Sequence, residues 1–399
     1  MTEEPTARTE TAGGQSLSDA LHEGENAVVR LLRAGVSAES SDEDGASALY
    51  LAAVSDRPGV VRLLLAAGAD PDRACGPESG DLPICGAACG GHTEVVEALL
   101  AAGATPDLPE QFGFTALRWA VGLGHARTAR MLLAHGADPC LPSPEGESPL
   151  LLAARRGSLE TVRALLSHGA GAREGALREA LGEARRMLDV DLEREMRAGL
   201  LDLYGDSDAH QVVVHRAVVD GGETLTVELV RDGKPRAGRD QQTGHGAIAT
   251  VLEAELGLLA PFEELARRAL SGGPELDNWQ AAADALRARG DEETRQAAAA
   301  WCAAGDPSRR AFGADVLARL GSPVPRSRGR CPRTPAPQSP ERLDFPAATT
   351  DLPAYRPAGQ NPAQPHLQPR RRLRRGVRGG AQGAAARRGN APAPGYRAP

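Results

Sequence analysis

Residues 63–72 read LLLAAGADPD, residues 99–107 read LLAAGATPD, and residues 132–140 read LLAHGADPC. Weaker copies stand at residues 31–37 (LLRAGVS) and 165–171 (LLSHGAG). The glycine shared by the five copies recurs after 33, 35, 33 and 33 residues. A period near 33 residues indicates an array of repeats, in which each unit buries its apolar surface against the next unit.

A second phrase keeps the same period and begins at Gly45, Gly80, Gly113 and Gly146. An apolar helical pattern follows each copy, as in VVEALL from Val95. Each unit therefore reads as a turn, a short helix, a loop, a longer helix and a final glycine. We expect this glycine to adopt the left-handed conformation that ends many helices.

Residues 16–172 resemble the ankyrin repeat, whose landmarks are TPLH, GH and LLLxxGAD. His92 and His125 keep the GH landmark. The histidine of TPLH is replaced in this chain by Tyr50, Cys85, Arg118 and Leu151. The first of about five units is degenerate and more polar, as expected of an N-terminal cap. The resemblance implies a mainly α fold, an ankyrin-repeat solenoid.

The pattern changes after the array. Residues 173–205 are predicted to form capping helices. Residues 206–260 are predicted to hold a β-hairpin plus a helix, because residues 211–219 and 223–230 alternate as strands do and a glycine-rich turn joins them.

Residues 261–322 are predicted to be helical, with Trp279 and Trp301 in their core. The last helix, DPSRRAFGADVLARLG at residues 306–321, resembles a HEAT-type helical repeat. Since no further helix follows, we expect its apolar side chains to be exposed: Phe312, Val316, Leu317 and Leu320.

Both ends of the chain are predicted to be disordered. Residues 1–15 are polar, and residues 323–399 carry 15 Arg, 15 Pro and three acidic residues without any helix or strand period. This Pro/Arg-rich tail is either a natural basic segment or the out-of-frame product of a reading frame lost near Ser322. We favour the second interpretation.

Charge and composition exclude several classes of protein. The net charge is −7 although the tail is basic, so the rest of the chain is acidic, which argues against a nucleic-acid partner. No apolar run approaches the about 20 residues of a membrane span, and the N-terminus does not resemble a signal peptide. Six scattered cysteines fit reduced thiols. We expect a cytoplasmic monomer without a membrane partner.

Two groups of residues contain side chains that are typical of a ligand site, and a simpler interpretation is favoured for each. Cys75, Cys85, Cys89 and His92 include the residue types of a zinc site, but their spacing is not that of a zinc finger, so no metal is predicted. The TGHG turn at residues 243–246 could hold an anion at the start of a helix. An ordinary helix-initiating turn is the favoured interpretation.

The ankyrin resemblance implies a protein partner bound on the concave face of hairpin tips and short helices, without catalytic residues or cofactors. The acidic tips favour a basic partner, and two phenylalanines are candidate anchors. The predicted partner-binding residues are Glu43, Asp44, Val54, Glu78, Asp81, Gln111, Phe112, Phe114, Leu123, Glu145, Glu147, Arg155 and Arg156.

Two alternatives remain open. One is an enzyme or regulator with its site in residues 206–322 and the array as a targeting arm; His210, His215 and His245 are its titratable candidates, although nothing in the sequence fixes their geometry. The other is a scaffold with several partners.

Overall fold

The computed structural model describes residues 16–76, 80–205, 211–219 and 222–321. The two segments predicted to be disordered, the favoured frame-loss site and Glu78 lie outside the described residues.

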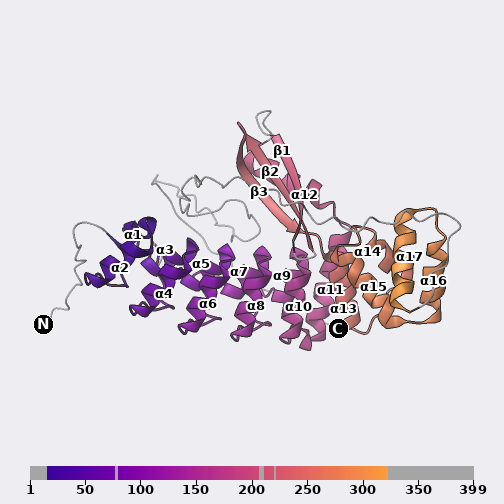
Figure 1. The fold of residues 1–399 in the computed structure, drawn as a ribbon, viewed down its shortest axis with the longest axis horizontal. Coiled ribbons are helices and arrows are strands. Elements are labelled where there is room, and N and C mark those ends of the chain that lie inside the picture. Colours follow the sequence, from indigo (N-terminus) through magenta and orange to yellow (C-terminus); the bar gives the residue numbers. More distant parts are fainter. Residues whose placement is uncertain (1–15, 77–79, 206–210, 220–221, 322–399) are drawn as a thin grey trace, which may run out of the picture. The chain divides into compact units, whose positions relative to one another are not determined.

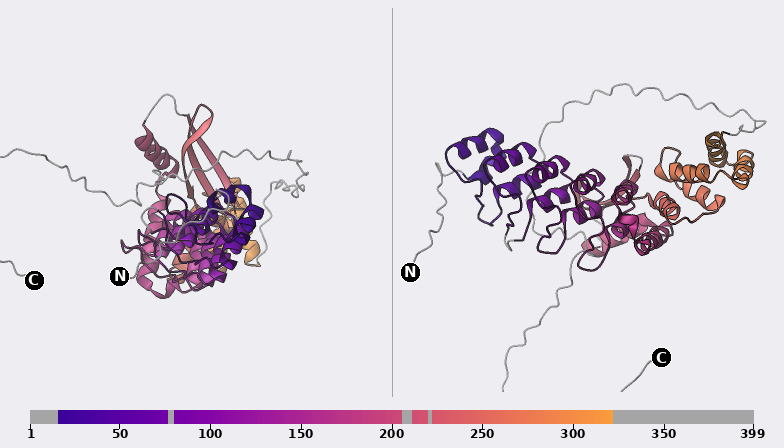
Figure 2. Two further views of the ribbon diagram at one scale, coloured as in Figure 1. Left: turned by 90° about the vertical axis from the view of Figure 1, so that its left-hand side faces the viewer. Right: turned by 90° about the horizontal axis from the view of Figure 1, so that it is seen from below.

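Five helix pairs form the first part of the fold (Figure 1). The first helix of each pair lies in one row and is called the inner helix: α1 (Leu17–Glu23), α3 (Ala48–Val54), α5 (Pro83–Gly90), α7 (Ala116–Leu123) and α9 (Pro149–Arg156). The second lies in the other row and is called the outer helix: α2 (Glu25–Arg33), α4 (Pro58–Ala66), α6 (Thr93–Ala101), α8 (Ala126–Ala134) and α10 (Leu159–Ser167). Figure 2 shows the same pairs from two further directions.

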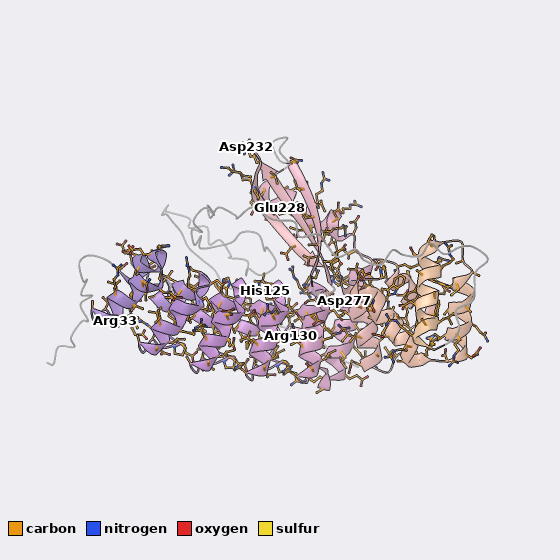
Figure 3. All side chains as sticks on the ribbon, in the orientation of Figure 1. Arg33, His125, Arg130, Glu228, Asp232 and Asp277 are labelled. Atoms are coloured by element: carbon orange, nitrogen blue, oxygen red, sulfur yellow. The ribbon has the colours of Figure 1, made fainter. Side chains whose placement is uncertain are left out.

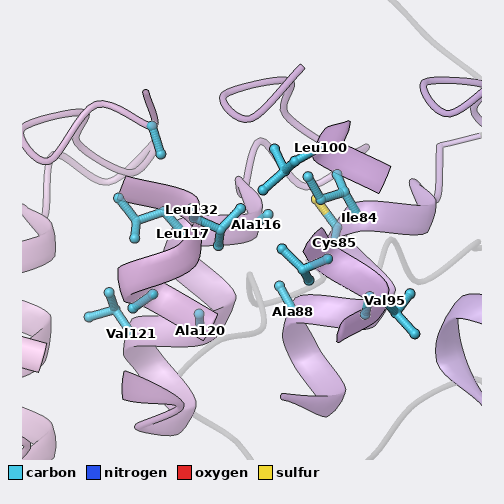
Figure 4. Close-up of a cluster of buried hydrophobic side chains, with 14 of the residues drawn as sticks. Ile84, Cys85, Ala88, Val95, Leu100, Ala116, Leu117, Ala120, Val121 and Leu132 are labelled. Carbon is cyan, nitrogen blue, oxygen red and sulfur yellow. The ribbon is translucent and has the colours of Figure 1, made fainter. Parts of the chain in front are cut away.

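Small and branched apolar residues join each pair to the next. Ala88 and Cys85 of α5 face Ala116 and Ala120 of α7 across a layer that is fully shielded from solvent (Figure 4). Alanine at these positions lets the inner helices approach closely, while Leu and Val fill the space between the rows. No unit buries this surface alone, so the stack stabilises every member.

The glycine that ends each unit has the backbone conformation expected from the sequence. Gly68, for example, has φ 92°, and its N–H donates to the carbonyl of Leu65 while that of Ala69 donates to Leu64. These two hydrogen bonds are typical of a helix that ends with a residue in the left-handed conformation. The same conformation recurs at Gly35, Gly103, Gly136 and Gly169.

A short 3₁₀ turn (Ala170–Ala172) leads from the array to α11 (Glu174–Leu188), which packs on α9. Helix α13 (His245–Glu255) packs on α11 and contacts α10. Helices α11 and α13 thus stand where the inner and outer helices of a sixth unit would stand. The intervening chain forms a separate small element.

That element consists of α12 (Leu192–Tyr204) and an antiparallel sheet in the order β1–β2–β3. Its strands are β1 (Gln211–Val219), β2 (Gly222–Arg231) and β3 (Lys234–Gln242). Leu225, Val227 and Leu229 alternate along β2 and bury themselves against Met196 and Leu200 of α12. Helix α12 and strand β2 therefore form a small hydrophobic core that is separate from the core of the array.

The predicted hairpin of β1 and β2 is confirmed, but the sheet has a third strand, β3, that was not predicted. Lys234–Gln242 reads KPRAGRDQQ, which lacks the apolar alternation of a half-buried strand. The overlooked signal is the Asp232-Gly233 turn, since both residues have positive φ (55° and 70°) and join β2 to β3 as a two-residue loop. Asp232 lies at the end of the sheet, beyond Glu228 of β2 (Figure 3).

Four helices complete the described chain: α14 (Phe262–Ala269), α15 (Asp277–Arg289), α16 (Glu292–Cys302) and α17 (Pro307–Arg319). Trp279 and Trp301 lie in their core, as predicted, and each ring packs edge-on against Phe312, with centroids 4.9 and 6.0 Å away. The expectation that α17 exposes its apolar face is wrong. Phe312, Val316 and Leu317 are at most 3% exposed, because α17 folds back onto α15 and α16.

Candidate functional site

The candidate site is the inner face, defined here as the hairpin tips and the solvent-facing side of α3, α5, α7 and α9. Each tip is closed by a bond or bridge across it, at residues 42–46, 75–81, 110–114 and 143–147. Ser47, Thr115 and Ser148 then cap the helices that follow, since each hydroxyl accepts a backbone N–H of the first turn. Tips and helices are therefore held in a fixed relation.

The structure brings most of the predicted partner-binding residues to this face. The exposed ones are Glu43, Asp44, Gln111, Phe112, Glu145 and Arg155. The half-buried ones are Val54, Asp81, Leu123, Glu147 and Arg156.

The two phenylalanines have different environments. Phe112 is 54% exposed at its tip, which is unusual for a ring of that size. Phe114 is only 6% exposed: its ring meets the edge of Trp119 at 5.7 Å and lies 4.6 Å below the guanidinium carbon of Arg118. Phe114 therefore supports the face from beneath and does not offer its ring to a partner, contrary to the sequence-based expectation.

The arginines at the C-terminal end of the face are already paired. Arg155 binds Glu147 and, at 2.8 Å, Glu183 of α11. Glu147 also binds Arg118 at 3.1 Å. Hydrogen bonds from Arg186 and then from Arg155 hold the pKa of Glu183 at about 2. At this end of the face, the negative charges of Glu147 and Glu183 are therefore balanced by the arginines that bind them.

Arg156 is held by the inserted element. Its guanidinium binds the carboxylate and the backbone oxygen of Asp240 in β3. Gln241 donates to the carbonyls of Arg155 and Arg156 at 2.9 and 2.7 Å. Arg156 thus connects β3 to the array. Its guanidinium is already bound by Asp240, contrary to the expectation that it binds a partner.

Glu110 is not among the partner-binding residues predicted from the sequence. It closes the third complete tip, where the equivalent Asp42 and Ser143 use short side chains to accept N–H groups of their own tip. The longer Glu110 instead accepts the indole N–H of Trp119 at 3.0 Å. The sequence signal that could have identified Glu110 is its length, because the equivalent positions of two other tips hold the shorter Asp42 and Ser143.

Glu110 is half-buried at the centre of the inner face. Burial raises its pKa to about 7; the bond from Trp119 opposes this shift, and nearby Asp81 adds to it. Burial, followed by the nearby acidic groups of Asp81, Cys75 and Glu110, also raises the pKa of Tyr50. A carboxyl group that titrates near neutral pH in a partly dry surface marks a candidate binding position.

The zinc hypothesis gains no support from the positions of these side chains. The Cys85 thiol points to the carbonyl of Phe114 at 3.8 Å, and His92 contacts the carbonyl of Val54 at 3.3 Å. Among the residues that the structure describes, no group of three or more His, Cys, Asp or Glu is placed to hold a metal ion.

The histidines proposed for a catalytic alternative serve other contacts. His215 lies on β1 beside Glu228, 3.6 Å away, and His210 falls outside the described residues. His245 is 2% exposed and donates to the carbonyl of Arg155 at 3.1 Å. The TGHG turn is thus a packed helix start rather than an open anion site.

A buried ionic cluster lies beside a cavity of about 580 Å³ between α11, α13 and α14. Arg268 and Glu253, 3% and 2% exposed, pair at 2.8 Å, and Arg185 and Glu264 complete the cluster. Burial alone would raise the pKa of Glu253, but bonds from Arg268 and Arg185 outweigh it and lower the pKa. Every carboxylate that the cluster buries is matched by an arginine, which suits a structural joint.

Comparison with known protein families identifies the array. Residues 58–143 and 84–174 match ankyrin repeats, described as three copies. None of the curated proteins matches the chain. In the part of the chain described here, none of the helices combines the length and apolar character needed to cross a bilayer.

Proposed function

Because residues 58–174 are ankyrin repeats, which are protein–protein interaction modules, we propose that this chain binds a protein partner on its inner face. The observation that carries the proposal is Phe112, a large ring exposed at the third complete tip. Exposed aromatic side chains with polar surroundings are the usual anchors of an interface. A HEAT-like role for α14–α17, a monomeric state and a cytoplasmic location remain predictions.

A photo-crosslinking residue placed at position 112 of the full chain tests this proposal. Under the proposal it captures a discrete protein partner in cell extract, identified by mass spectrometry. The matched control is the same residue at Leu259, which is 77% exposed in the loop after α13 and distant in sequence from the array. Equal capture at both positions, or none at position 112, would contradict binding on the inner face.

A further inference from the structure

The charges of the inner face are distributed unevenly along the array. At the C-terminal end, Glu147 and Glu183 are each matched by arginines. In the middle and towards the N-terminus, Glu43, Asp44 and Glu110 have no cationic side chain within ion-pair distance among the described residues. These three carboxylates stand at the tips of the second and fourth units, and Glu145 at the tip of the fifth unit is likewise outside the ion pairs of the described residues.

Aromatic groups surround the most buried of these carboxylates. Trp119 donates its indole N–H to Glu110. The charges of Asp81 and Glu110 also act on the hydroxyl group of Tyr50 in α3, across α5. Helix α5 contributes Gly86, where an added Cβ would come within 3.0 Å of the Tyr50 ring, so the ring lies directly on the helix. Cys85 and Cys89 are the other titratable groups that α5 places near Glu110.

We infer that the middle of the inner face binds an extended segment of its partner through a Lys or Arg side chain, placed on Glu110 beside Trp119 and Tyr50. This inference rests on the proposed function. A cation next to a half-buried carboxylate gains a charge-assisted hydrogen bond. Phe112 at the same tip supplies the apolar contact.

The chemistry favours a basic protein segment over other ligands. The arginines of the face are occupied by internal partners, so an acidic segment would find no unpaired cation there. Burial chiefly raises the pKa of Glu110 and the charge of Asp81 adds to it; a partner cation would offset both effects by stabilising the ionised carboxylate. Electrostatic complementarity of this kind sets the position of the partner and the rate of association.

Selection of a random peptide phage library on the full chain provides the test. We expect the selected peptides to be enriched in Lys and Arg, and Glu110→Gln to weaken their binding by about tenfold. Glutamine keeps the oxygen that accepts the Trp119 bond, so the substitution removes charge without removing the tip contact. Glu97→Gln, on the exposed side of outer helix α6, is the matched loss of one negative charge and should change binding by less than about twofold.

The outcomes separate this inference from the proposed function. Peptides that need Phe112 but bind Glu110→Gln and wild type equally would overturn the basic-segment inference and leave inner-face binding intact. Peptides insensitive to both Phe112→Ala and Glu110→Gln would overturn both. Equal weakening by Glu97→Gln and Glu110→Gln would show attraction to overall charge and would also overturn the inference.

Discussion

His245 donates its Nε2 hydrogen to the carbonyl oxygen of Arg155 at 3.1 Å, across 90 residues of sequence. His125 makes the same contact with the carbonyl of Cys89 at 3.1 Å, and His92 makes it with Val54 at 3.3 Å. In each case a histidine at the start of one helix reaches the C-terminal part of the inner helix in the unit before. The Gly244-His245 pair is therefore the GH landmark of a sixth unit, whose two helices are separated by the inserted element.

Replacing His245 should weaken the joint between α9 and α13. His245→Ala removes one of the two side-chain hydrogen bonds to the carbonyl of Arg155, the other coming from Gln241, and leaves a gap in the packing, so we expect a loss of roughly 1–3 kcal/mol in the free energy of unfolding. His215→Ala, on the exposed strand β1, should change it by less than about 0.5 kcal/mol. Urea denaturation of both variants measures the difference. Equal effects would show that the Arg155 contact carries no stability.

The same histidine gives stability a dependence on pH. Burial lowers the pKa of His245, so the folded protein keeps it neutral while the unfolded chain takes up a proton below about pH 6.5. The unfolded state then binds more protons, and stability falls as the pH falls below that value. Urea midpoints at pH 7.5 and 5.5 should therefore separate more for wild type than for His245→Ala.

Glu110 should act with the opposite sign. Its raised pKa, about 7 in the folded protein against an ordinary value of 4.5, means that the folded state holds the extra proton between these values. Stability conferred by this group is present at low pH and lost as the pH rises to 7. Glu110→Gln should accordingly stabilise the protein at pH 8, by on the order of 1–3 kcal/mol, and change little at pH 4. Thermal melts at both pH values check this; a larger gain at pH 4 would contradict it.

The buried pair of Arg268 and Glu253 should respond strongly to the loss of one partner. Arg268→Ala leaves Glu253 with only the exposed Arg185, and removing half of a buried pair costs about 3–5 kcal/mol. Arg267→Ala, which removes a solvent-exposed pair with Glu264, should cost less than about 1 kcal/mol. If both variants unfold at the same denaturant concentration, the joint between α13 and α14 does not depend on the pair.

Removing the inserted element should leave the array folded. Its apolar core with α12 is separate from that of the helix pairs, so replacing residues 190–243 by a short Gly-Ser linker should retain helicity and a cooperative transition. Circular dichroism and thermal melting measure both. A broad, non-cooperative melt would mean that α11 and α13 require the insertion in order to pair.

The sequence was sufficient where one unit resembles the next. The 33-residue period located the final glycines, and the apolar pattern from Val95 falls within α6. It could not show that Arg155 and Arg156 are occupied, because their partners Glu183 and Asp240 lie far away in the chain. The sixth unit could not be found from the 33-residue period, because the inserted element separates its two helices and places His245 outside the spacing of His92 and His125.

The insertion of α12 and the sheet between α11 and α13 affects the order in which the helices can fold. Helix α13 can reach α11 only after residues 189–244 close as a loop, and the entropy lost in closure grows slowly with length, so the final structure tolerates the insertion. Contacts that span long stretches nevertheless form late. During synthesis the first five helix pairs can assemble behind the ribosome, whereas α13, and with it the docking of α14 onto the array, must wait until the sheet has emerged.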